Sequence, residues 1–255
     1  MWIDTHCHLD AAEFDADRER VWQASLSAGV KTLVVPSVEV ANFSAVSAIC
    51  RLRPGCFPAY GIHPMFVSRA EEADLDFLRK TLEKGGAVAV GEIGLDFFVP
   101  ERDEERQEWF LAEQLKLARD FDLPVLLHVR RAVDGVLKHL RRIPVRGGIA
   151  HAFNGSRQQA DEFIKLGFKL GFGGAMTWGR ALRLRELASS LPLESIVLET
   201  DAPDIPPEFV GKGRNSPEFL PRIAATLADL RGLSLEEVAA ATSANARAVL
   251  PGLCA

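Results

Sequence analysis

Short apolar segments alternate with longer amphipathic segments along the whole chain. Several of the short segments are nearly continuous runs of Val, Ile, Leu and Ala, which is typical of parallel strands that helices cover. They occupy residues 2–6, 32–36, 57–61, 88–93, 124–129, 148–151, 168–172 and 195–200. We therefore predict eight buried parallel strands.

Helical periodicity connects these strands. It is clearest over residues 104–121, where apolar residues recur at helical spacing among Glu and Lys. Further helices are expected at residues 160–166, 181–190, 217–230 and 233–250, the last as one or two helices with a break near 242–245. Eight strands that alternate with helices predict an α/β fold of the (β/α)8 TIM-barrel type.

The length of 255 residues suits one such barrel, which typically needs about 250 residues, or two smaller domains. No Pro/Ser-rich linker marks a boundary, so residues 1–255 are expected to form a single TIM-barrel domain. An open doubly wound sheet is the alternative fold. The turn expected after Val90, Gly91-Glu92-Ile93-Gly94-Leu95-Asp96, lacks the glycine spacing of a dinucleotide-binding fingerprint.

Composition narrows the class of protein. With 47% hydrophobic and 25% charged residues the chain is an ordinary globular protein, and its net charge of -5 gives no general attraction to a polyanion. The four cysteines lack C-x-x-C spacing, which favours reduced thiols. Neither a secretory signal nor an apolar run of roughly 20 residues is visible. We expect a soluble, cytoplasmic protein with no membrane contact and no obligate protein partner.

A pair of histidines, His6 and His8, ends the first apolar segment. Side chains alternate along a strand with a period of two, so both imidazoles point the same way and can bind one metal ion. Cys7, the residue between them, is expected to face away as a core thiol. An isolated His-x-His at a strand end is more often structural, so the interpretation depends on further ligands.

In a (β/α)8 barrel the carboxyl ends of the strands converge on one mouth, where functional groups gather. Five of the six histidines and two acidic residues fall at predicted strand ends: His6, His8, His63, Glu92, His128, His151 and Asp201. Only His139 lies elsewhere, on a helix, where solvent exposure is expected. This joint placement predicts a metal site.

The predicted ligands exceed what one catalytic ion uses, since such an ion typically keeps three protein ligands and an open position. Two divalent ions about 3.5 to 4 Å apart, sharing one carboxylate, would use the full set. Imidazole suits Zn, Mn or Fe better than Mg, which prefers oxygen ligands, so the residues leave the metal open.

Six motifs, taken together and in order, resemble the TatD family of metal-dependent hydrolases, in the amidohydrolase-like barrel group. The resemblance spans nearly the whole chain. The motifs are Asp4-Thr5-His6-Cys7-His8, Gly61-Ile62-His63-Pro64, Gly91-Glu92-Ile93-Gly94-Leu95-Asp96, Leu127-His128-Val129-Arg130, His151-Ala152-Phe153-Asn154-Gly155 and Glu199-Thr200-Asp201-Ala202-Pro203.

The resemblance implies specific roles for these residues. His6, His8 and Asp201 would bind one ion, His128 and His151 the other, and Glu92 would bridge the two. It also implies a magnesium-dependent deoxyribonuclease or related phosphoesterase, whereas the histidine ligands favour Mn or Zn.

The mechanism expected from these residues is in-line attack on phosphorus by a hydroxide that the two metal ions activate. Glu92 and Asp201 are the expected catalytic residues, with Asp201 serving as general base and then general acid. No G-x-S-x-G elbow suggests a serine nucleophile.

Other functions stay open from sequence. The same chemistry serves amides and esters, including acyl groups on transfer RNA, and a barrel that keeps its metal as a structural element is a third possibility. A small phosphodiester or the end of a single DNA strand suits a narrow, acidic barrel better than duplex DNA.

Two further side chains are expected to bind substrate. The resemblance places His63 near the substrate phosphate, although it can also be a turn histidine before Pro64. Arg130 shares a strand face with His128 and can bind a phosphate through its planar guanidinium, or form an internal salt bridge instead. Glu199, on the face of Asp201, is expected to orient neighbouring groups.

One loop departs from the family pattern. Residues 211–217 resemble the family's Arg-Asn-Glu-Pro loop, but Ser216 stands where glutamate is usual, which leaves the hydrogen bonding of the loop open. Lys212 and Arg214 in this loop can form a basic rim or an ordinary solvated surface.

Overall fold

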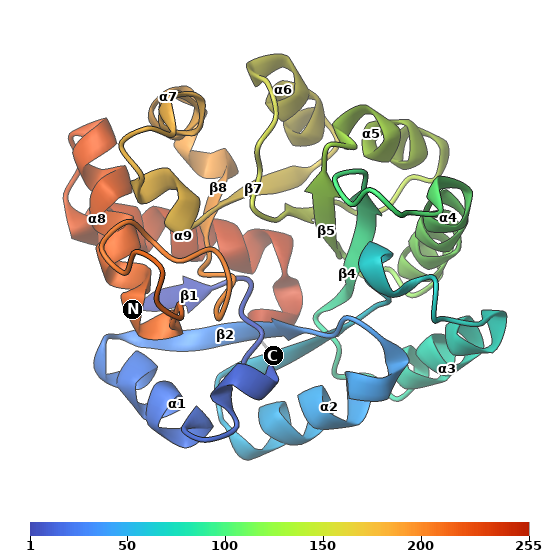
Figure 1. Ribbon diagram of the computed structural model, residues 1–255. Helices are drawn as coiled ribbons and strands as arrows, with labels where there is room; N and C mark the ends of the chain where they lie inside the picture. Colours follow the sequence, from blue (N-terminus) through green and yellow to red (C-terminus); the bar gives the residue numbers. More distant parts are fainter. Residues whose placement is uncertain (255) are drawn as a thin grey trace.

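The computed structural model describes residues 1–254 and contains one sheet of eight parallel strands in the order β1 to β8 (Figure 1). The strands are β1 Trp2–Asp4, β2 Val30–Pro36, β3 Cys56–Tyr60, β4 Ala89–Asp96, β5 Val125–Arg130, β6 Gly148–Ala150, β7 Phe168–Phe172 and β8 Ile196–Leu198. The amide and hydroxyl of Thr5 both donate to Leu198 O, at 3.1 Å each, and so link the ends of β1 and β8. The predicted TIM barrel is confirmed.

Helices surround this barrel on its outside (Figure 1). They are α1 Arg18–Ser27, α2 Phe43–Leu52, α3 Glu72–Glu83, α4 Glu104–Asp120, α5 Val133–Arg142, α6 Arg157–Lys165, α7 Leu182–Ser190, α8 Leu220–Arg231 and α9 Leu235–Val249. Among them, no helix is both long and apolar enough to cross a membrane.

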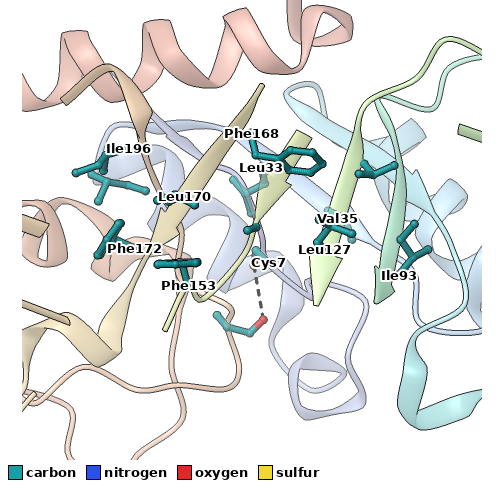
Figure 2. Packing of buried hydrophobic residues seen from close by; sticks show 14 of the residues in the cluster. Cys7, Leu33, Val35, Ile93, Leu127, Phe153, Phe168, Leu170, Phe172 and Ile196 are labelled. Carbon is teal, nitrogen blue, oxygen red and sulfur yellow. Dashed lines mark hydrogen bonds between the residues drawn. The ribbon is translucent and has the colours of Figure 1, made fainter. Parts of the chain in front are cut away.

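Two apolar layers enclose the strands because successive side chains alternate between the two faces of the sheet. Leu33 and Val35 of β2 belong to the larger cluster, between strands and helices, part of which Figure 2 shows. Val34, the residue between them, belongs to a second cluster. That cluster combines alternate strand residues with the end of α9: Ile3, Val34, Ala59, Val88, Ala89, Leu126, Ile149, Val197, Ala246, Val249, Leu250 and Leu253.

Strand β4 is longer than predicted and contains the segment expected to be a turn. It continues to Asp96, pairing Gly94 with His128 and Asp96 with Arg130 of β5. At Gly94 a Cβ atom would lie 1.9 Å from the carbonyl oxygen of His128, so only glycine permits this close approach. Glu92 and Asp96 therefore lie on a strand, which fixes their positions.

Two predictions for the helices were wrong. Helix α9 is continuous through residues 242–245, because Thr242 donates to Val238 O within the helix and Asn245 donates to Leu193 O and Ile196 O outside it. His139 is buried rather than solvent-exposed, since α5 turns it toward α4, with Nε2 3.5 Å from Glu108 Oε2.

The cysteines are free thiols where their side chains are described. Cys7 and Cys56 are buried and Cys50 is partly buried, while the side chain of Cys254 lies outside the described part. Cys7 sits among apolar side chains and its thiol donates to Ala202 O at 3.8 Å (Figure 2). It faces the core, as predicted.

Candidate metal centre

Backbone hydrogen bonds between the segments after β1 and β8 assemble the first part of the site. Asp201 N donates to His6 O at 2.8 Å, and His8 N donates to Ala202 O at 2.8 Å. Both segments have left their strands here, since β1 ends at Asp4 and β8 at Leu198. The two histidines nevertheless face the same point, with their Nε2 atoms 3.3 Å apart and each 3.6 Å from Asp201 Oδ1.

Glu92 occupies the middle of the site. Its Oε2 lies 3.1 Å from His6 Nε2 and 3.5 Å from His8 Nε2. Its Oε1 lies 3.0 Å from His128 Nδ1 and 3.2 Å from His151 Nε2. The Glu92 amide donates to Ser37 O at 3.0 Å, which anchors the residue next to the end of β2. The two oxygens of one buried carboxylate thus face two separate sets of imidazoles.

Buried carboxylates also contact the outer nitrogens of two of these imidazoles. Asp96 Oδ2 lies 2.9 Å from His128 Nε2, and Glu199 Oε1 lies 3.4 Å from His151 Nδ1. Carboxylates in this position orient metal-binding histidines and fix their tautomers. Asp96 is itself held on both sides, because Phe98 N donates to its Oδ1 and its backbone bonds the side chain of Gln107. Glu199 also accepts from Ala152 N at 2.5 Å.

Sequence reasoning missed the role of Asp96. Glu92 and Asp96 are four residues apart on one strand, so the period of two places both carboxylates on the same face. This spacing is visible in the sequence, but it identifies Asp96 only when the strand is known to continue past Ile93. The role expected of Glu199, orienting its neighbours, agrees with its contacts.

The electrostatics of the site favour positive charge. Burial lowers the pKa of His8, but the hydrogen bond to Glu92 and the charge of Asp201 outweigh it and raise that pKa to about 9. Burial also lowers the pKa of His128 and of His151. Nearby carboxylates outweigh this effect, so both pKa values are raised. Burial and the charge of His151 lower the pKa of His6 to about 3, so this ring stays neutral.

The two carboxylates of the site respond in opposite directions. Burial opposes ionisation of Glu92, but the surrounding histidines hold its pKa well below the usual range. Burial raises the pKa of Asp201 to about 6, although His151 and His8 oppose the shift. Glu92 is therefore a permanent anion, and Asp201 is suited to exchange a proton near neutral pH.

These donor atoms fit a divalent cation. Ligand atoms bonded to one ion at about 2.1 Å stand about 3 to 3.5 Å apart, and the spacings within His6, His8 and Asp201 match that range closely. Three groups of donor atoms lie within 4.8 Å of one another: His6, His8 and Asp201; His6, Glu92 and His151; and His63, Glu92 and His128. The raised pKa values of three histidines show that the site favours positive charge. A bound cation would supply that charge.

His63 lies closer to the centre than its predicted role requires. Its Nε2 is 3.4 Å from Glu92 Oε1, and its ring meets that of His128 edge-on at 4.2 Å between centroids. Its Nδ1 accepts from Met65 N at 3.2 Å, so in the neutral ring the proton resides on Nε2, facing the site. Burial lowers the pKa of His63 to about 4, which keeps the ring neutral and makes it a hydrogen-bond donor there.

Arg130 lies at the edge of the site. Its guanidinium is 4.0 Å from Asp96 Oδ2 and stacks on Phe98 at 3.8 Å from the ring centroid, with half of the side chain exposed. The salt bridge that was the alternative for Arg130 is thus present, and the exposed half can still meet a ligand.

The loop of residues 211–217 contributes little free charge. Arg214 forms a two-pronged ion pair with Asp17, at 2.9 and 2.7 Å, so only Lys212 remains as an exposed cation of the expected basic rim. Ser216 is buried, and its hydroxyl donates to Glu218 Oε1 at 3.2 Å. Local hydrogen bonding is therefore satisfied without a glutamate at this position.

Comparison with known protein families and structures agrees with the geometry. The family model of TatD-related DNases matches residues 3–251. The chain is similar to YjjV of Escherichia coli K12, an uncharacterized metal-dependent hydrolase, with 43% identity over 96% of this chain and 95% of that protein. The crystal structure of that TatD homologue superposes with a TM-score of 0.95 at 42% identity, covering 98% of each chain.

A nuclease is also among the similar proteins. The chain is 33% identical to the 3'-5' ssDNA/RNA exonuclease TatD of Pantoea vagans C9-1, over 96% of this chain and 97% of that protein.

Proposed function

Because this chain belongs to the family of TatD-related DNases and is a metal-dependent hydrolase, we propose that it hydrolyses phosphodiester bonds in single-stranded nucleic acid. The observation that carries this proposal is Glu92, whose two oxygens face two sets of imidazoles at the mouth of the barrel. Two-ion sites of this kind suit in-line displacement at phosphorus. Residues 1–255 are proposed to act as one catalytic domain.

The proposed ligands of the first ion are His6, His8 and Asp201, and those of the second are His128 and His151, with Glu92 shared between them. Divalent ions at these positions, Mn, Zn or Mg, would lower the pKa of water and stabilise charge on the phosphoryl oxygens. The ligand chemistry favours Mn or Zn.

Asp201 is proposed to move the proton. Its contacts with His6 and His8 both run through Oδ1, which leaves Oδ2 to take the proton of the attacking water. Oδ2 could hold that proton and return it to the leaving alcohol. Glu92 stays ionised throughout, because its pKa lies well below the usual range.

His63 and Arg130 are proposed to bind the phosphate. The Nε2 proton of the neutral His63 ring faces the site and can donate to a phosphoryl oxygen. Arg130 offers the exposed half of its guanidinium from the end of β5. Both would hold substrate without taking part in bond cleavage.

The test compares three substrates on protein reconstituted separately with Mn, Zn and Mg. They are bis-p-nitrophenyl phosphate, a 5'-labelled single-stranded DNA oligonucleotide, and an aminoacyl-tRNA. We expect hydrolysis of both phosphodiesters and none of the acyl ester. Acyl cleavage without phosphodiester cleavage would replace this function by that of a deacylase, and inactivity toward all three with two ions bound would favour a non-enzymatic role.

A further inference from the structure

An exposed aromatic ring beside the metal centre carries two guanidinium groups. Phe98 is 44% exposed, and the guanidinium carbons of Arg130 and Arg131 lie 3.8 and 4.6 Å from its ring centroid. Two guanidinium groups beside one partly exposed phenyl ring make this part of the surface both apolar and positive. We call Phe98, Arg130 and Arg131 the Phe98 platform.

The fold holds this platform in a fixed position relative to the centre. Phe98 N donates to Asp96 Oδ1 at 2.9 Å, and Phe97 N donates to Arg130 O at 2.8 Å. The other oxygen of Asp96 contacts His128, which in turn contacts Glu92. One buried carboxylate, Asp96, therefore connects the platform to a proposed metal ligand.

The backbone at Arg131 departs from the strand in a way that builds the platform. Consecutive residues of a strand point to opposite faces, so Arg130 and Arg131 would not meet one ring if β5 simply continued. Arg131 instead has a φ of 55°, in the left-handed region that disfavours a long side chain. A non-glycine residue held there next to an active site is a pointer to function.

The charge of the platform is incompletely balanced. Arg130 meets only Asp96, at 4.0 Å, and that carboxylate already contacts His128. Arg131 forms no ion pair within residues 1–254, and both arginines are exposed. In a chain of net charge -5, such a local excess of positive charge beside the mouth suits an anionic ligand that also has a flat apolar face.

We propose that the Phe98 platform binds the nucleotide that flanks the scissile phosphate, with its base stacked on the platform and its phosphate paired with Arg131. This rests on the proposed phosphodiesterase function and deepens it. An aromatic or guanidinium plane stacks any unpaired base, whereas a base within a duplex has no free face. The platform would therefore select single strands without selecting sequence.

The test measures binding and turnover separately. Fluorescence anisotropy of a labelled oligo-dT strand reports affinity for the metal-free protein, in which no hydrolysis intervenes. We expect Phe98→Ala and Phe98→Leu each to weaken binding about tenfold, because both remove the stacking face and leucine keeps apolar bulk. Arg131→Ala should lower the dependence of binding on salt by nearly one phosphate contact.

Turnover sharpens the assignment. In the metal-loaded enzyme, Phe98→Ala should reduce kcat/KM for the oligonucleotide about tenfold more than kcat/KM for an abasic oligonucleotide of the same length, which has no base to stack. The matched controls are Phe77→Ala, at a 46% exposed phenylalanine on α3, and Arg142→Ala, at the opposite end of α5 from Arg131. Both should behave as the unaltered protein in each assay.

The outcomes separate the two proposals. If both Phe98 variants bind oligo-dT with wild-type affinity and show the wild-type ratio of kcat/KM for the two substrates, the platform proposal is wrong. The proposed phosphodiesterase function would be unaffected. Oligonucleotide binding that depends on Phe98, without hydrolysis of any phosphodiester, would overturn the enzymatic function and keep the platform. Equal losses in Phe77→Ala and Phe98→Ala would also overturn the platform.

Discussion

The two halves of the candidate centre are built by different means. Around His6, His8 and Asp201, backbone hydrogen bonds between the segments after β1 and β8 set the geometry, and His6 Nδ1 is buried without a partner. Around His128 on β5 and His151 just after β6, buried carboxylates stand behind the rings: Asp96 is hydrogen-bonded to His128, and Glu199 lies 3.4 Å from His151 Nδ1 without a hydrogen bond. Replacing a carboxylate behind one of these rings should therefore weaken binding of the second ion and leave binding of the first ion unchanged.

This difference has a chemical consequence. A carboxylate behind an imidazole makes the ring a more basic and better oriented ligand. The second half is therefore expected to bind its ion through polarised histidines, and the first half through His6, His8 and the carboxylate of Asp201.

The largest effect on turnover and metal content is expected from removing Glu92, the carboxylate that the two halves share. Glu92→Ala should lower kcat by a factor of about 1,000 or more and reduce bound metal from two ions to less than one, since both halves lose a ligand. Metal content by elemental analysis, alongside bis-p-nitrophenyl phosphate turnover, checks this. His139→Gln, which alters the one histidine outside the site, is the control. Two retained ions in Glu92→Ala would show that the halves are independent.

Replacing Asp96 should separate the two halves. Asp96→Ala removes the partner of His128 Nε2, so affinity for the second ion should fall about 10- to 100-fold while the first ion stays bound. Equilibrium dialysis against Mn or Zn gives the two constants. Asp96→Asn keeps a hydrogen-bond acceptor without the charge and should lie between the two. An equal loss of affinity for both ions in Asp96→Ala would contradict the assignment of Asp96 to the second half alone.

Glu199 offers a milder test of the same half. Its oxygen is 3.4 Å from His151 Nδ1, longer than the Asp96 contact, so Glu199→Gln should weaken the second ion by a factor of about 10 or less. Glutamine preserves the volume that packs against Gly171 and Gly173, where even a methyl group has no room. A larger loss of affinity for the second ion in Glu199→Gln than in Asp96→Asn would contradict this prediction and make Glu199 the more important of the two carboxylates.

Proton release should report on the first half. With a pKa of about 9, His8 carries a proton at pH 7 in the metal-free protein, and a metal ion binds only the neutral ring. Metal affinity should therefore rise with pH up to about 9 and then level off on account of this group. Calorimetric titration in two buffers of different ionisation enthalpy counts the protons. An identical heat in both buffers would contradict the assignment.

The smallest effect is expected at the surface beside the first half. Arg214→Ala breaks the exposed pair with Asp17 and should lower Tm by about 2 °C or less, with both metal affinities unchanged. The Arg214 guanidinium holds the pKa of Asp17 at about 2, below its ordinary value. The pair thus stabilises the fold above about pH 4 and loses its effect as pH falls toward 2, which thermal unfolding across that range measures.

Much of this architecture was predictable from sequence because the strands contain short apolar runs and the proposed ligands lie near or just after the ends of these runs. The histidines at positions 6, 8, 128 and 151 could be grouped because parallel strands end at a common mouth. Asp96 and Phe98 could not, since their placement depends on the close approach of β4 and β5 at Gly94. The burial of His139 likewise depends on how α5 packs against α4, which periodicity alone does not determine.

The apolar cluster inside the strands, which includes Val34 of β2, Leu126 of β5 and Val249 at the end of α9, makes the barrel a blind cup. Under the proposed function, a nucleic-acid strand would therefore reach the metal centre from the open face of the barrel alone and would have to leave by the same face.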